Sequence, residues 1–243
     1  MLKKIITTLL LALILSSCGA FYPEALTKVD SVLSYSKFDK SYSLNMSDNV
    51  VKIDKNEKGQ DIGGYLELAL SEKLKDDSSL SVLNLKWVSL KYFLDISKGK
   101  QIWMKLDDNE IIKLFALDNG ITSKDVHVSS TPGYLHTSPS GVVGYSSGSA
   151  YSTQEFTEKV SFSIKEEDIE KIANANKVTF EIDSEKKISG SFHKKNFQNF
   201  QNFILQSKKL KNNKELVFKE YKEEVERKLK KKKDDRVKNA MRR

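Results

Sequence analysis

The feature that most constrains this fold is that the chain has a single cysteine, Cys18, among its 243 residues. One thiol cannot close an intramolecular disulfide, and it cannot supply the cysteine cluster of a structural zinc site. Packing and hydrogen bonding must therefore hold the folded domain together. About 190 residues lie between Cys18 and the basic C-terminal end, which is enough for one domain with a substantial core.

The segment before Cys18 has the pattern of an export signal. Lys3 and Lys4 precede an uncharged, largely apolar run over residues 5–15, and two serines follow that run. The run is shorter than the roughly 20 apolar residues that span a bilayer. A basic start, an apolar middle and small residues at the cut site make a signal peptide. We therefore expect residues 1–17 to be removed on export.

The four residues Leu15-Ser16-Ser17-Cys18 resemble the bacterial lipobox, in which an apolar residue and two small residues precede a cysteine. In that family the thiol is alkylated with a diacylglycerol and the peptide bond before the cysteine is cut. Two or three acyl chains give stable anchoring, whereas one chain is marginal. The resemblance implies lipidation of Cys18 and a place in the cell envelope, on the outer face of the cytoplasmic membrane or on the outer membrane. The alternative is a plain signal peptide with a chance cysteine.

The formal charge of +8 is concentrated at the C-terminal end. Residues 208–243 hold sixteen basic and seven acidic residues, a net of +9, and the signal adds +2, which leaves −3 for residues 18–207. The densest basic run contains Lys228, Lys230, Lys231, Lys232 and Lys233. This run is either a solubilising end or a site that binds anionic lipid or wall polymer. Export from the cytoplasm argues against nucleic acid as a partner.

These observations predict three parts: a lipoprotein signal peptide over residues 1–17, one exported domain over 18–207, and a basic helical tail over 208–243. The first part of the domain, residues 18–40, should contain a linker and a helix. In the tail, apolar residues recur at helical spacing and form one narrow stripe. That stripe consists of Phe218, Tyr221, Val225 and Leu229.

Short apolar runs separated by turn residues predict several strands. Residues 44–46 and 50–53 read as two strands around a turn. Residues 101–117 read as a hairpin, and residues 178–182 and 188–192 form a second one across a short turn.

Two further segments are less regular. From 82 to 96 the residues are apolar and aromatic, and the face with the large side chains changes near Trp87. Such a change indicates a bulge or a strand that is buried on both faces. Residues 129–153 are rich in serine, glycine and tyrosine, and we interpret them as a long surface loop or an irregular hairpin.

Three helices are expected. One begins at Pro23, and a second follows a capping box formed by Ser163 and Glu166. The apolar faces consist of Leu26, Val29, Val32 and Leu33 in the first, of Ile169, Ile172 and Ala173 in the second, and of Phe197, Phe200, Phe203 and Ile204 in the third.

Strands outnumber helices, and short turns join neighbouring strands. The predicted fold class is therefore α+β, with a mainly antiparallel sheet, a few helices near the two ends and a long basic C-terminal helix. The strand-helix-hairpin-helix pattern that ends the domain is similar to that of several uncharacterised bacterial lipoproteins. The resemblance brings no catalytic residue with it.

One motif suggests catalysis. Residues 144–148 match the G-x-S-x-G pattern of a serine nucleophile at Ser146, and Asp168 or Asp183 and then His193 follow in the order of an α/β-hydrolase. That motif needs a strand before it and a helix after it, whereas serine, glycine and tyrosine surround it here. We interpret Ser146 as a loop residue and His193 as a solvated side chain.

Metal sites have no better support in the sequence. His127 and His136 lack the spacing of a zinc site, and residues 54–59 carry Lys58 where a calcium loop needs a ligand. No phosphate-binding loop or dinucleotide fingerprint is present. We therefore predict no metal, no cofactor and no catalytic residue.

The sequence favours a non-catalytic envelope lipoprotein that binds an envelope protein or polymer. Aromatic residues suited to recognition are Trp87, Trp103, Tyr134, Tyr145 and Tyr151. The two tryptophans fit the core equally well. Two alternatives remain: a serine hydrolase that uses Ser146, and an assembly or inhibitor protein that acts by strand addition at a sheet edge.

Overall fold

The computed structural model describes residues 23–54, 62–75, 78–107, 109–131, 134–137, 143–146 and 149–220, together with the short pieces 222–223, 226–227 and 230–231. The fold is α+β with a large antiparallel sheet and a few helices, as predicted. The helices are α2 (Pro23–Leu26), α3 (Glu166–Asn174) and α4 (Lys194–Asn212), and residues 214–220 are helical again after Asn213.

The strands pair in an order that differs from their order in the chain. They are β1 (Ser31–Ser36), β2 (Ser41–Met46), β3 (Val50–Ile53), β4 (Gly64–Lys75), β5 (Ser78–Ser89), β6 (Gln101–Leu106), β7 (Glu110–Phe115), β8 (Ile121–Thr131), β9 (Tyr134–Thr137), β10 (Val143–Ser146), β11 (Ser149–Ser163), β12 (Val178–Ile182) and β13 (Ile188–Ser191). Eleven of these described strands form one sheet in the order β7-β6-β12-β13-β3-β4-β5-β11-β8, with β2 on β4 and β1 on β2, while β9 and β10 pair separately.

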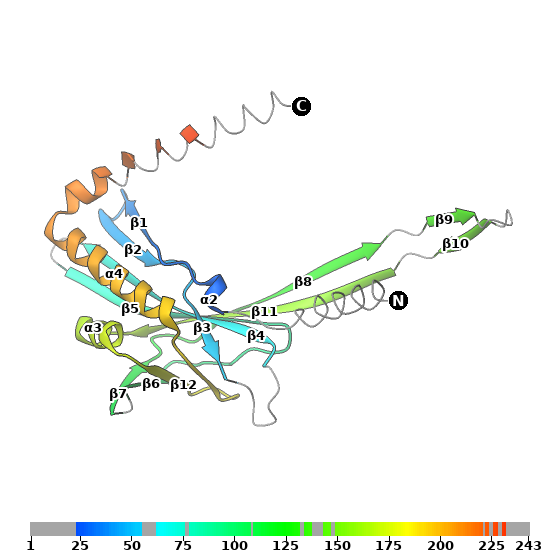
Figure 1. Ribbon diagram of the computed structural model, residues 1–243, viewed down its shortest axis with the longest axis horizontal. Helices are drawn as coiled ribbons and strands as arrows, with labels where there is room; N and C mark the ends of the chain where they lie inside the picture. The colour runs from blue at the N-terminus through cyan, green and yellow to red at the C-terminus, as the bar shows by residue number, and fades with distance from the viewer. Residues whose placement is uncertain are drawn as a thin grey trace, which may run out of the picture.

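The sheet curls around the core, and a bridge between Ala116 and Phe162 joins its β7 side to β11. Helix α4 lies across β1, β2 and β4, and α3 packs against α4 (Figure 1). The core includes the fully buried Leu66, Leu68, Leu83, Phe200 and Phe203. The cysteine-free body is thus closed by apolar packing, as the sequence requires.

Most of the predicted elements are confirmed. Residues 101–106 and 110–115 form a hairpin, as do β12 and β13. The described residues of the segment 129–153 pair antiparallel, β8 with β11 and β9 with β10, which favours the irregular hairpin over the surface loop. The strands predicted around 47–49 exist but do not pair with each other. Both lie on the same edge of β4, β2 opposite residues 71–75 and β3 opposite residues 66–67.

One helix was predicted too long and the start of another was predicted wrongly. The first helix begins at Pro23 as predicted but ends at Leu26, and Val32 and Leu33 belong to β1, where one is exposed and the other buried as in a strand. Pairing with β2 decides this conformation over the local spacing. Ser163 ends β11 and does not cap α3, whose N-cap is Lys165 without a side-chain bond.

The end of β5 explains the change of face near Trp87. Trp87, Val88 and Ser89 are all buried, and their pairing with both β4 and β11 continues without a skipped residue. The strand is therefore buried on both faces. Trp87 has no exposed surface, and its indole N–H donates to the carbonyl of Tyr92 at 3.0 Å. The prediction of Trp87 as a partner contact is wrong, and the core alternative is correct.

Buried asparagines fix α4 over the break between β2 and β3. Asn196 donates to Asn49 Oδ1 at 2.9 Å and to the carbonyl of Val50 at 3.0 Å, and Asn199 donates to the carbonyl of Ser47 at 3.1 Å. His193 joins this network, because its Nε2 lies 2.9 Å from the same Val50 carbonyl. The prediction of a solvated His193 is therefore wrong.

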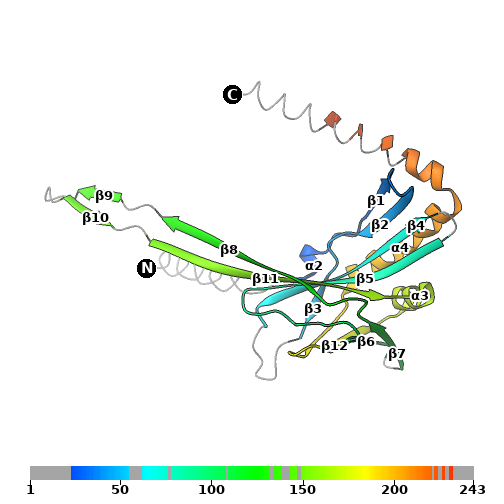
Figure 2. The same ribbon diagram turned by 180° about the vertical axis from the view of Figure 1, so that it is seen from behind.

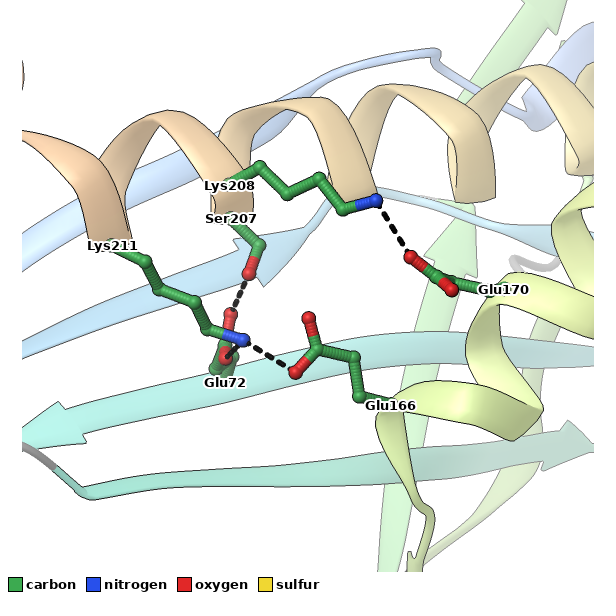
Figure 3. Close-up of polar contacts among 6 residues, drawn as sticks. All are labelled: Glu72, Glu166, Glu170, Ser207, Lys208 and Lys211. Atoms are coloured by element: carbon green, nitrogen blue, oxygen red, sulfur yellow. Dashed lines mark hydrogen bonds and ion pairs between the residues drawn. The ribbon is translucent and has the colours of Figure 1, made fainter.

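A buried carboxylate holds the second half of α4 (Figure 3). Glu72 continues the buried face of β4, and its carboxylate accepts a hydrogen bond from Ser207 and lies 2.9 Å from Lys211 Nζ. Lys211 also contacts Glu166 of α3 at 2.9 Å. Burial lowers the pKa of Lys211, but its bonds to Glu166 and Glu72 outweigh burial and hold this pKa above the ordinary value. The cluster therefore joins β4, α3 and α4.

We expect Glu72→Ala to lower the free energy of unfolding by about 3 kcal/mol, the lower end for a broken buried ion pair, because Lys211 keeps Glu166. The double substitution Glu72→Leu with Lys211→Met should lower the free energy of unfolding clearly less, because it leaves no buried charge without a partner. Urea unfolding of both variants measures this difference. Equal losses of unfolding free energy in the two variants would contradict the assignment of Glu72 and Lys211 as a buried ion pair.

Candidate functional site

The most distinctive surface is a two-stranded arm that leaves the body of the molecule. Strand β11 pairs with β8 over residues 149–159 but with β5 only over residues 156–163. Residues 149–155 thus have β8 as their one strand partner in the described part of the chain. Both views show β8 and β11 extending together away from the helices (Figures 1 and 2). We call the paired residues 121–131 and 149–159 the arm.

One edge of the arm has no described strand beside it. Strand β8 is the last strand in the order of the sheet, so no described strand pairs with its outer edge. Residues 121–128 are exposed throughout, including Ile121 at 75%, Val126 at 56% and Val128 at 72%. A long, exposed edge with β-branched residues readily pairs with another chain. The arm therefore has the geometry of a docking element.

A buried carboxylate fixes the root of the arm. Glu158 of β11 is fully buried, and its two oxygens accept three successive backbone N–H groups, from Leu94 at 2.6 Å, Asp95 at 3.0 Å and Ile96 at 2.7 Å. Asp95 has a left-handed φ of 57°, which turns the amides toward one point as in an anion-binding nest. The Glu158 carboxylate occupies this nest, so the nest has a structural role.

Gly120 lies against the same carboxylate. A Cβ at this position would lie 2.6 Å from Glu158 Oε1, which is closer than any side chain tolerates. The backbone amide of Gly120 donates to the carbonyl of Ile96 at 2.8 Å. The loop at 94–96, the start of β8 and β11 are thus held together where the arm leaves the body.

We expect Glu158→Gln to lower the free energy of unfolding by about 1–3 kcal/mol, because a neutral amide cannot accept all three N–H groups. Hydrogen exchange should become faster at Leu94 and Ile96. The matched control is Glu155→Gln on the same strand, which should change stability by less than about 0.5 kcal/mol. Urea unfolding and hydrogen exchange test both variants, and equal effects would contradict a special role for Glu158.

No protein-family model, curated protein or solved structure matches this chain.

A second surface lies on the outer face of the sheet. A shallow groove of about 410 Å³ runs over β6, β7, β12 and β13, and Trp103, Lys105, Lys113 and Glu181 line it. Trp103 is half-buried, and its indole N–H donates to Gln101 Oε1 at 2.8 Å. Trp103 remains a candidate contact residue on this face, apart from the arm.

The predicted tyrosine contacts lie toward the far end of the arm. Tyr151 is opposite Ser129 in the arm, and Tyr134 and Tyr145 belong to the β9–β10 pair. The side chains of these tyrosines lie outside the described part of the structure. The sequence missed β8 itself, because Ile121, Val126 and Val128 show no regular alternation.

The predicted membrane contacts are only partly described. Cys18, Lys228, Lys232 and Lys233 lie outside the described residues, whereas Lys230 and Lys231 are exposed in a helical segment. The start of the tail is fixed to the body, because Phe218 packs on Tyr35 and Tyr42 with ring centroids 5.1 and 5.7 Å apart. No helix of the described residues is long and apolar enough to cross a membrane.

The residues of the hydrolase alternative do not come together. Ser146 ends β10 in a two-stranded hairpin, and Figure 1 shows this hairpin at the opposite end of the molecule from α3 and α4. Asp168 lies in α3, and His193 precedes α4, where it contacts Val50 and Thr27. Among the described residues, no group of histidine and acidic side chains could hold a metal ion.

Proposed function

We propose that this protein is a membrane-anchored envelope lipoprotein with a non-catalytic binding role, and that the arm is its partner contact. The single observation that carries the binding role is the uncovered edge of β8, where exposed residues 121–128 follow a root fixed by Glu158. A rigid root and an open edge suit the strand-addition mode of recognition.

The membrane attachment rests on the sequence. The lipobox at Leu15–Cys18 supplies the lipid anchor, and the exposed Lys230 and Lys231, with the basic residues around them, supply an attraction to anionic lipid or wall polymer. The serine-hydrolase alternative gains no support, because Ser146 lies on a hairpin strand. The assembly role by strand addition becomes the form of binding that we favour.

We expect the natural chain to carry a diacylglycerol-sized mass increment and to partition into the detergent phase, because lipid on Cys18 buries long acyl chains. Cys18→Ala should lose both properties. Intact-protein mass and detergent phase partitioning measure them. An unmodified Cys18 in the natural chain would refute the anchor and the envelope location with it.

The arm is tested by site-specific photo-crosslinking in intact cells. A photoreactive residue at Val128 should give a discrete adduct, because this side chain is 72% exposed beside the free edge. The same residue at Leu205 of α4, which is 53% exposed, is the matched control and should give none. In the chain labelled at Val128, Val126→Lys should reduce the adduct several-fold, because charge on an edge strand blocks pairing. Absence of any adduct at Val128 would refute the binding role of the arm.

A further inference from the structure

The free strand β8 has a symmetric pattern about Val126. Asp125 and His127 flank this residue and share one face of the strand, while Lys124 and Val128 share the other face with Val126. When two copies of one strand pair antiparallel about a two-fold axis, each residue faces a residue of the same face. With Val126 at the axis, it faces the second copy's Val126, and Asp125 faces the second copy's His127.

On the face that carries Asp125 and His127, no positive side chain lies directly opposite Asp125 within one copy, and the second copy supplies one. Asp125 lies directly opposite Glu155 in the register of β8 with β11. Two carboxylates side by side on a strand pair repel each other, and within the described residues neither has an ion pair. The second copy's His127 would lie next to Asp125 in the same row, where it donates a hydrogen bond or carries a positive charge. The relation is reciprocal, so the contact forms twice.

On the face that carries Lys124, Val126 and Val128, pairing buries apolar surface and so stabilises the dimer. Val126 is 56% exposed and Val128 is 72% exposed. In this register the two copies of Val126 contact each other, and Val128 covers the aliphatic part of the second copy's Lys124. Lys124 already lies over the Phe156 ring, with its Nζ 5.4 Å from the ring centroid. The two arms then form one continuous four-stranded sheet, and the open backbone groups of both edges are paired.

We infer that the partner of the arm is a second copy of this chain, paired antiparallel through β8 with Val126 on the two-fold axis. This inference rests on the proposed function, because it names the partner of the same arm.

Cysteine pairs test the register on the full lipidated chain in detergent. Directly opposite residues of an antiparallel pair have Cα atoms about 4.5–5.5 Å apart, within the roughly 4.4–6.8 Å that a disulfide spans. Val126→Cys should therefore form a disulfide-linked dimer under mild oxidation. Lys124→Cys and Val128→Cys should not do so alone, but a mixture of these two chains should cross-link to each other. The natural chain under the same oxidation gives the background.

A charge exchange gives a second test without cysteine. In the His127→Asp variant, residue 127 places a like charge opposite the second copy's Asp125 at two symmetric places. We therefore expect the dimer affinity measured by sedimentation to fall by roughly tenfold. Combining Asp125→His with His127→Asp restores opposite partners and should recover most of the natural affinity. Failure of the double exchange to recover affinity, with both variants folded, overturns the register.

The outcomes also separate this inference from the proposed function. A chain that remains monomeric in detergent overturns self-pairing, and cysteine links that form at 124 or 128 alone overturn the register about Val126. If photo-crosslinks at Val128 then join the chain to a different protein, self-pairing is wrong while the proposed binding role stands. If Val128 gives no adduct at all, both fail.

Discussion

The fold depends on one edge of β4, which two short strands share. The chain leaves β2 and enters β3 along that edge, and the break between them exposes backbone groups that no strand can pair. Buried Asn49, Asn196 and Asn199 satisfy these groups through side-chain bonds and fix α4 over the break. Buried polar groups without a hydrogen-bond partner in this position would lower the stability of the fold. The break therefore determines where α4 lies, and with it where Lys211 meets Glu72.

The arm extends the opposite side of the same sheet. Strand β11 is fifteen residues long, and its second half belongs to the body, where β5 pairs with it. Its first half has only β8 beside it in the described structure. An isolated two-stranded ribbon is marginally stable in water, so the arm depends on its fixed root at Glu158 and gains most from a further strand.

Elements with a regular local spacing of apolar residues are predictable from the sequence, whereas elements that depend on tertiary contacts are not. The hairpin of β6 and β7 and the apolar face of α4 follow directly from residue spacing. The spacing of Val32 and Leu33 fits both a helix and a strand, and pairing with β2 settles it. Asn196 and Asn199 recur among the phenylalanines of α4, a signal of a buried polar face that hydrophobic patterns alone do not reveal. The free edge of β8 has no local signature, because it depends on the absence of a neighbouring strand.

Comparison of the two candidate surfaces favours the arm on energetic grounds. In the outer groove, Trp103 already donates to Gln101, and Ser189 already donates to Asp54, so a ligand must compete with existing bonds. The outer edge of β8 offers backbone groups that no described strand pairs, so a further strand can bond to them without breaking a strand pair of the described sheet. If Cys18 carries lipid as proposed, the five residues from Cys18 to Pro23 keep Pro23 within about 17 Å of the lipidated cysteine. Confinement to one surface raises the effective concentration of the arms, so even weak edge pairing would bring two chains together.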